Sequence, residues 1–304
     1  MKVSTSYLFD RATERMTDIQ NRLATTQAQL SVSKQILSPS DAPDQAAAIQ
    51  RIKGEIDRQA SHSALLKAAL NRYRAEETSL TSANDILTRL KELGLQAAND
   101  TLGLDDRKGI AVEMKAFRSQ LMTMGNTRDD NGNYIFSGTR VNTPAFSEDV
   151  NGNVVYNGDQ TQTRIPAGVE RTVQYTRAGT DAFQRVVRSD GEAVGFFDAL
   201  DQLITAVDTS QTAQIQQGNA DLSQMQNALG LSLAQVGSDQ QVVQSQLDVL
   251  DETALRLKST LSDIQDLDYA EAVTRMNKEM MAMQAAMSSF SKISGLSLFN
   301  YIQN

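Results

Sequence analysis

Apolar residues recur in alternating steps of three and four at both ends of the chain, which is the spacing of a heptad stripe along one side of a helix. In the first 34 residues the stripe consists of Phe9, Ala12, Met16, Ile19, Leu23, Thr26 and Leu30. Near the other end it consists of Val243, Leu247, Leu250, Ala254, Leu257, Leu261 and Ile264. The register slips at residues 267–270 and resumes as Val273, Met276, Met280, Met283, Met287 and Phe290. Stripes this apolar need a partner, so we expect another helix or another molecule to cover them.

Two prolines end the first helix. Residues 38–43 read SPSDAP, and prolines at both positions exclude a continuous helix there. Ser40 or Asp41 is suited to cap the next helix, with Pro43 in its first turn. We expect a hinge between the terminal and inner helices, formed by Ser38, Pro39, Ser40, Asp41 and Pro43.

The next apolar stripe predicts one long helix over residues 42–99. At a rise of ~1.5 Å per residue such a helix is roughly 85 Å long, which favours a rod over a sphere. Residues 99–103 interrupt it. Asp105 and Asp106 then suit a helix start, because acidic side chains favour the positive end of the helix dipole. Helices resume at about Val194 and lead into the C-terminal stripe.

The middle of the chain has a different composition. Nine of the 17 glycines fall in residues 125–195, where turn sequences separate short β-favouring runs. We predict strands in four runs, at residues 134–136, 154–156, 169–175 and 183–188.

The patterns together predict a mainly α fold with a small β insertion, arranged as an elongated helical rod with terminal coiled-coil helices. We expect polymerisation segments at residues 1–43 and 263–304, a helical rod domain at 44–127 and 193–262, and a β-rich insertion at 128–192.

Composition narrows the function classes. The net charge of −8 argues against a nucleic-acid partner held by bulk charge. The chain has no cysteine and a single histidine, His62, which excludes thiol chemistry and two-histidine metal sites. The first 30 residues are too charged for a secretory signal, and no run is apolar enough to span a bilayer. These signals alone indicate a cytoplasmic protein, with export that needs no cleaved signal left open.

We find no candidate catalytic, cofactor-binding or metal-binding residue. His62 has no neighbouring ligand cluster, and a solvated or helix-packed histidine is the favoured interpretation. Residues 129–133 (DDNGN) superficially resemble a calcium loop but lack its ligand register, so a hairpin turn is favoured. The sequence NDT at 99–101 fits a glycosylation site, and a helix break explains it equally well.

Five stretches resemble the flagellin-like axial proteins of the bacterial flagellum, and the resemblance covers essentially the whole chain. They are residues 3–5 (VST), 38–43 (SPSDAP), 131–138 (NGNYIFSG), 268–272 (DYAEA) and 291–302 (SKISGLSLFNYI). The strand motif YIFSG and the tail SLFNYI resemble the members that lie between the hook and the filament. Residues 145–192 match no specific pattern of the family.

The resemblance implies a secreted, non-enzymatic component that joins the hook to the flagellin filament after export through the flagellar type III channel. It also implies self-association, contacts with the hook-side junction protein (hook-associated protein 1) and with flagellin, and an export chaperone on the C-terminal helix. No cofactor, nucleic acid or membrane is implied. The interface would use the two heptad stripes, including Phe9, Met16, Ile19, Leu23, Leu30, Leu257, Leu261, Ile264, Val273, Met276, Met280, Met283, Met287, Phe290 and Leu298.

Three other hypotheses stay open at this point. The nearest is flagellin itself, the filament subunit. The others are a carboxylate-based glycosidase on a helical rod, which no motif supports, and a type III secretion tip protein, whose usual membrane-active apolar segment this chain lacks.

Overall fold

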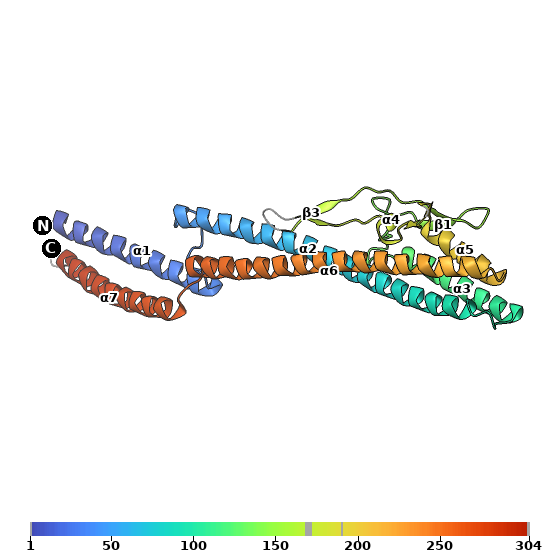
Figure 1. The fold of residues 1–304 in the computed structure, drawn as a ribbon. Helices are drawn as coiled ribbons and strands as arrows, with labels where there is room; N and C mark the ends of the chain where they lie inside the picture. The colour runs from blue at the N-terminus through green and yellow to red at the C-terminus, as the bar shows by residue number, and fades with distance from the viewer. Residues whose placement is uncertain (1, 168–171, 190, 303–304) are drawn as a thin grey trace. The chain divides into compact units, whose positions relative to one another are not determined.

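The computed structural model describes residues 2–167, 172–189 and 191–302, and it is mainly helical with short strand pairs (Figure 1). The helices are α1 (Lys2–Val32), α2 (Pro43–Ala97), α3 (Leu104–Gly125), α4 (Gly179–Ala182), α5 (Phe196–Asp208), α6 (Thr212–Gln265) and α7 (Tyr269–Ile302). The strands are β1 (Phe146–Glu148), β2 (Val154–Tyr156), β3 (Arg164–Pro166), β4 (Thr172–Gln174), β5 (Val186–Val187) and β6 (Ala193–Val194). β1 pairs with β2, β3 with β4 and β5 with β6, and each pair is antiparallel. The predicted fold class, mainly α with a small β insertion, is confirmed.

The described chain divides into two compact units. Unit 1 comprises Met1–Ala60 and Glu252–Asn304, and unit 2 comprises Ser61–Asp251. Helices α2 and α6 each continue from one unit into the other. The boundaries that we predicted at residues 43 and 263 fall close to helix breaks within unit 1.

The predicted strands are only partly present. Residues 154–156 form β2, and Thr172–Gln174 of the run predicted at 169–175 form β4, whereas 183–188 contribute only Val186–Val187. Residues 169–171 of the predicted run lie outside the described residues. Residues 134–136 form no strand. Their backbone is irregular because other groups take its carbonyls: Arg72 donates to the carbonyl of Ile135 at 2.8 Å, and the backbone N–H of Gly179 donates to that of Phe136 at 2.7 Å.

The core of unit 2 lies between its helices, with the insertion packed on it. The largest fully buried side chains include Leu66, Tyr73, Leu80, Leu87, Leu90, Leu93, Met114, Leu121, Leu200 and Leu203, contributed by α2, α3 and α5. Leu222, Leu229 and Val236 of α6 join the same core. On α3, the side chains of Ile110, Met114 and Leu121 are buried in this core.

An aromatic cluster attaches the insertion to the helices. The ring of Phe146 lies 5.3 Å from that of Phe183 and 5.2 Å from that of Phe197, measured between centroids. Gly125 at the end of α3 permits this approach, since a Cβ there would lie 2.7 Å from Cδ2 of Phe146.

Buried arginines hold the insertion from several sides. Arg177 pairs with Glu76 of α2 at 2.5 Å and with Asp239 of α6 at 3.1 Å, and all three side chains are at least nine-tenths buried. Burial raises the pKa of Glu76, and the nearby Arg177 opposes that rise. Arg118 of α3 in turn pairs with Glu148 at 2.5 Å. These ion pairs connect segments far apart in the sequence, so the position of the insertion depends on them.

Replacing Arg177 with methionine should lower the free energy of unfolding by about 3 to 5 kcal/mol, because Glu76 and Asp239 would be left buried without a cation. Urea denaturation followed by circular dichroism measures this change. The matched control is Arg89→Gln, which removes an exposed arginine paired with Glu92. An equal loss in both variants would contradict the importance of the buried pairs.

Candidate assembly surface

Helices α1 and α7 lie side by side and antiparallel in unit 1 (Figure 1). Toward the start of α1 and the end of α7, the rings of Phe9 and Phe290 are 4.9 Å apart, measured between centroids. Near their inner ends Arg275 donates a hydrogen bond to the side chain of Gln29 at 3.4 Å. The two terminal helices therefore pair with each other within one chain.

The line of α7 that faces α1 differs from the predicted stripe. Its partly buried positions include Met276, Glu279, Met283, Ala286 and Phe290, again in alternating steps of three and four. The predicted Met280 and Met287 instead lie outside this line, with exposed fractions of 37% and 48%. The apolar pattern alone does not select Glu279 and Ala286, and the exposed Met280 and Met287 remain predicted contacts with other molecules.

On α1, four of the predicted residues, Met16, Ile19, Leu23 and Leu30, are partly buried, and Phe9 is exposed. Val273 on α7 is also partly buried, as are Leu257, Leu261 and Ile264 on α6. The side chain of Leu298 lies outside the described residues. None of the predicted interface residues that the structure describes is fully buried within the chain.

A polar group interrupts the line between α1 and α7. The Oε2 atom of Glu279 is buried and has no hydrogen-bond partner among the described residues. The Nε atom of Arg275, one turn away on α7, is likewise buried and has no hydrogen-bond partner among the described residues. A buried polar atom without a partner is destabilising, so the α1–α7 pairing is weaker than its apolar residues alone would make it.

The two helix breaks of unit 1 are joined by backbone hydrogen bonds. The N–H of Gln35 donates to the carbonyl of Gln265 at 2.9 Å, and the N–H of Leu267 donates to that of Ser33 at 3.2 Å. Lys34 and Asp266 form an antiparallel bridge between these bonds. The end of α1 is thereby fixed to the link between α6 and α7.

Asp41 organises the proline segment in a way that the sequence analysis missed. Its Oδ2 atom accepts hydrogen bonds from the backbone N–H groups of Leu37 and Ser38, at 3.2 and 2.8 Å. Since α2 begins at Pro43, Asp41 closes the turn before the helix and does not act as the expected cap. Ser38 and Ser40 hydrogen-bond to each other through their hydroxyl groups.

Unit 1 also has an open groove of about 500 Å³, between the N-terminal part of α2 and the C-terminal part of α6. Leu257 lines it together with Ile52, Gly54 and Glu55. A hydrogen bond from Arg58 lowers the pKa of Glu55, so this carboxylate is charged at neutral pH. Large exposed apolar side chains also occur on unit 1, among them Tyr7, Val32, Leu255, Tyr269 and Met281.

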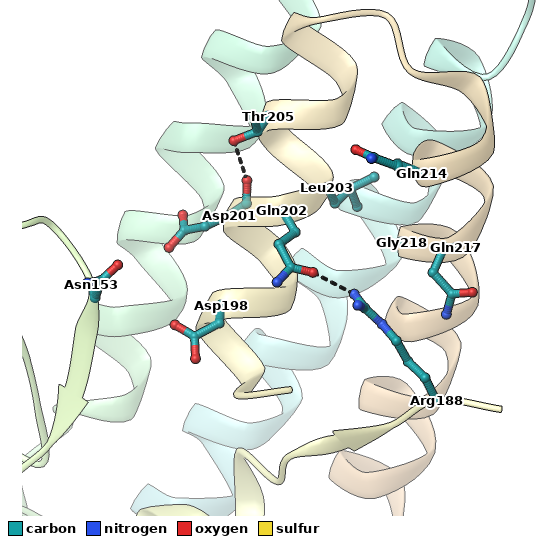
Figure 2. A pocket seen from close by; sticks show the side chains of 10 residues that line it. All are labelled: Asn153, Arg188, Asp198, Asp201, Gln202, Leu203, Thr205, Gln214, Gln217 and Gly218. Atoms are coloured by element: carbon teal, nitrogen blue, oxygen red, sulfur yellow. Dashed lines mark hydrogen bonds between the residues drawn. The ribbon is translucent and has the colours of Figure 1, made fainter. Parts of the chain in front are cut away.

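Unit 2 contains a polar pocket of about 570 Å³, between the turn before β2, helix α5 and the start of α6 (Figure 2). Arg188 lies in it and donates to Gln202 at 2.7 Å and to Asp221 at 2.7 Å. Burial raises the pKa of Asp201, and its pairing with Arg118 opposes that rise. Arg188 and Asp201 are thus each paired with an oppositely charged side chain, and none of the described lining residues is aromatic. We interpret the pocket as part of the packing of the insertion.

Other site types find no support in the part of the chain that the structure describes. Within it, no group of three or more histidine, aspartate and glutamate side chains is placed to hold a metal ion. The DDNGN turn is explained by Asp129, whose Oδ1 accepts the backbone N–H groups of Asn131 and Asn133. His62 lies 3.1 Å from the carbonyl of Pro166. No helix in the described ranges is both long and apolar enough to cross a membrane.

Comparison with known protein families finds matches along most of the chain. Residues 3–141 match the bacterial flagellin N-terminal helical region, and residues 213–302 match the bacterial flagellin C-terminal helical region. The chain therefore belongs to the flagellin-like family of the bacterial flagellum.

Within that family the chain is similar to flagellar hook-associated protein 3 of Escherichia coli (strain K12), with 26% identity over 98% of this chain and 99% of the relative. The crystal structure of FlgL from Xanthomonas campestris shares the fold, with a TM-score of 0.60 and 22% identity over 70% of this chain and 99% of that one. A flagellin from Listeria innocua matches with 20% identity over 96% of this chain and 95% of the relative.

Replacing Glu279 with leucine should stabilise the α1–α7 pair by about 1 to 3 kcal/mol, because it removes a buried oxygen that has no partner and adds apolar contact. Thermal melting of the full chain followed by circular dichroism measures this change. Met280→Leu is the control, since Met280 lies one residue along and outside the contact line. If both variants melt like the parent protein, Glu279 does not weaken the pairing.

Proposed function

We propose that this protein is a non-enzymatic structural component of the flagellum that joins the hook to the flagellin filament. The observation that carries the proposal is the similarity to hook-associated protein 3 along 98% of this chain and 99% of that relative. The two proteins thus correspond along nearly their whole lengths. Flagellin matches at lower identity, 20% against 26%.

The incomplete burial of α1 and α7 supports a role in a polymer. Two helices alone leave Phe9, Met280 and Met287 exposed, and the groove beside Leu257 is open. Exposed apolar side chains on a helix pair that is itself only partly buried are typical of an interaction surface. We infer that this surface is covered on assembly by further copies of the chain, by the hook-side junction protein and by flagellin.

The charge distribution favours the same interpretation. Unit 1 contains 13 basic and 13 acidic residues, so it has no net charge, and the whole net charge of −8 lies on unit 2. A neutral unit can pack against copies of itself without net Coulomb repulsion. Unit 1 is therefore the part of the chain suited to the dense interior of an assembly.

We further propose that the protein is secreted through the flagellar export channel and that a chaperone holds the C-terminal helix until then. Methionine side chains adapt their shape to different partners. The exposed Met280, Met281 and Met287 would let α7 bind first a chaperone and later the polymer. The segment 38–43 would act as the hinge between the terminal and inner helices.

Deletion of the gene, followed by electron microscopy and an assay for flagellin in the medium, tests the proposal. Bare hooks together with flagellin shed into the medium are expected, because filament subunits would be exported without a place to attach. Bare hooks with no secreted flagellin would identify the chain as the filament subunit. Normal filaments would contradict a flagellar role.

Introducing a charge at Leu257 should abolish filament attachment while secretion is little affected, because a carboxylate would have to be desolvated in the assembled groove. Leu257→Glu is compared with Lys258→Glu, which places the same charge one residue along at an exposed position. Swimming and the amount of the variant in the medium are measured in the complemented deletion strain. Filaments of normal length on the Leu257→Glu strain would count against this interface.

A further inference from the structure

One stretch of α6 in unit 2 has no charged residue on its solvent-exposed side. Residues 212–247 contain two charged residues, Asp221 and Asp239, which are 1% and 7% exposed. Each is paired with an arginine of the insertion, Arg188 and Arg177 respectively. Both acidic side chains of this stretch thus point into the unit.

The exposed side of this stretch is therefore uncharged. We call it the α6 face and define it by Asn227, Gly230, Leu231, Ala234, Gly237, Ser238, Gln241 and Ser245, all of them exposed. Five of its members, at 227, 230, 234, 237 and 241, follow steps of three and four, so they form one line along the helix.

The neighbouring helices of unit 2 differ in this respect. Among their exposed residues, α2 carries Lys67, Arg74 and Glu77, and α3 carries Asp105 and Lys115. An ordinary solvent-facing helix has charged residues of this kind. Depletion of charge is characteristic of the central part of protein–protein interfaces, and the α6 face shares this feature.

Two glycines on the face have no explanation within the chain. Gly230 and Gly237 lie in the interior of α6, where glycine is unfavourable relative to alanine. A Cβ at either position would meet nothing within 4 Å, so no intramolecular contact requires their small size. Beside them Leu231 is 71% exposed. Small residues next to an exposed leucine allow another backbone to approach closely.

We propose that the α6 face packs against unit 2 of a second copy of this chain. Unit 2 contains 24 acidic and 16 basic residues, so two copies repel each other wherever their charged faces meet. The α6 face is uncharged, so two copies can meet there without bringing like charges together. The inference rests on the proposed assembly of several copies in one layer, and it places a lateral contact in unit 2 in addition to that of unit 1.

Cysteine labelling tests this contact, because the natural chain has no cysteine. Ala234→Cys and Ser238→Cys place a thiol on the face, and Ala116→Cys places one on the charged surface of α3 as the control. Each variant is labelled with a maleimide as the free folded subunit and within purified flagella. We expect the face positions to be labelled in the free subunit and protected in flagella, and position 116 to be labelled in both.

A maleimide carrying a photoreactive benzophenone then identifies the neighbour. A product with twice the 33.3 kDa mass of the chain supports a second copy. Equal labelling of residue 234 in free subunits and flagella would overturn the contact, and cross-linking to a different flagellar protein would overturn the choice of partner. Absence of the wild-type chain from flagella would instead refute the proposed function on which the inference rests.

A pair of glycine substitutions gives an independent readout. Gly237→Ala should raise the melting temperature of the free subunit, because alanine favours the helix, and should reduce filament attachment, because the added Cβ blocks the neighbour. Gly109→Ala on α3 is the control, since a Cβ there also meets nothing within 4 Å. It should raise the melting temperature and leave attachment unchanged. Normal attachment in both variants would contradict close packing at Gly237.

Discussion

Two paired helices cannot exclude water from the apolar line between them, and this limit governs unit 1. Met16, Ile19 and Leu23 of α1 are only partly buried against α7, and Phe9 is exposed although its ring contacts Phe290. In a larger bundle such residues would lie in a core. Here part of their apolar surface remains in contact with water. Covering that surface with further molecules would add hydrophobic stabilisation. The marginal pairing of the free chain and its capacity to assemble thus have the same cause.

Unit 2 contains short strand pairs that could not be stable alone, so they depend on packing against the helices. Phe146 and the buried ion pairs of Arg177 connect the insertion to helices that are distant in the sequence. Such pairs cost desolvation, and their geometry fixes one position for the insertion. A segment that matched no specific pattern of the family is therefore firmly integrated into the unit.

The sequence predicted the long helices well because their determinants are local. The proline pair before α2 and the register slip before α7 both correspond to real breaks, and α2 spans Pro43–Ala97 against a prediction of 42–99. It could not predict which of several equivalent lines on α7 faces α1, since Glu279 and Met280 are neighbours and hydrophobicity alone selected the methionine. Nor could it predict Arg177 with Glu76 and Asp239, because no spacing rule connects residues so far apart along the chain. Asp41 was recognised as important, but its role depends on turn geometry that only the coordinates reveal.

The backbone bridge at Lys34 and Asp266 has a mechanical consequence. Because hydrogen bonds cross between the two helix breaks, neither α1 nor α7 can swing about its own link without breaking main-chain hydrogen bonds. The two terminal helices therefore behave as a single lever rather than as two independent arms. A force applied to either helix is shared by both links, and ordering the pair fixes the orientation of one body instead of two.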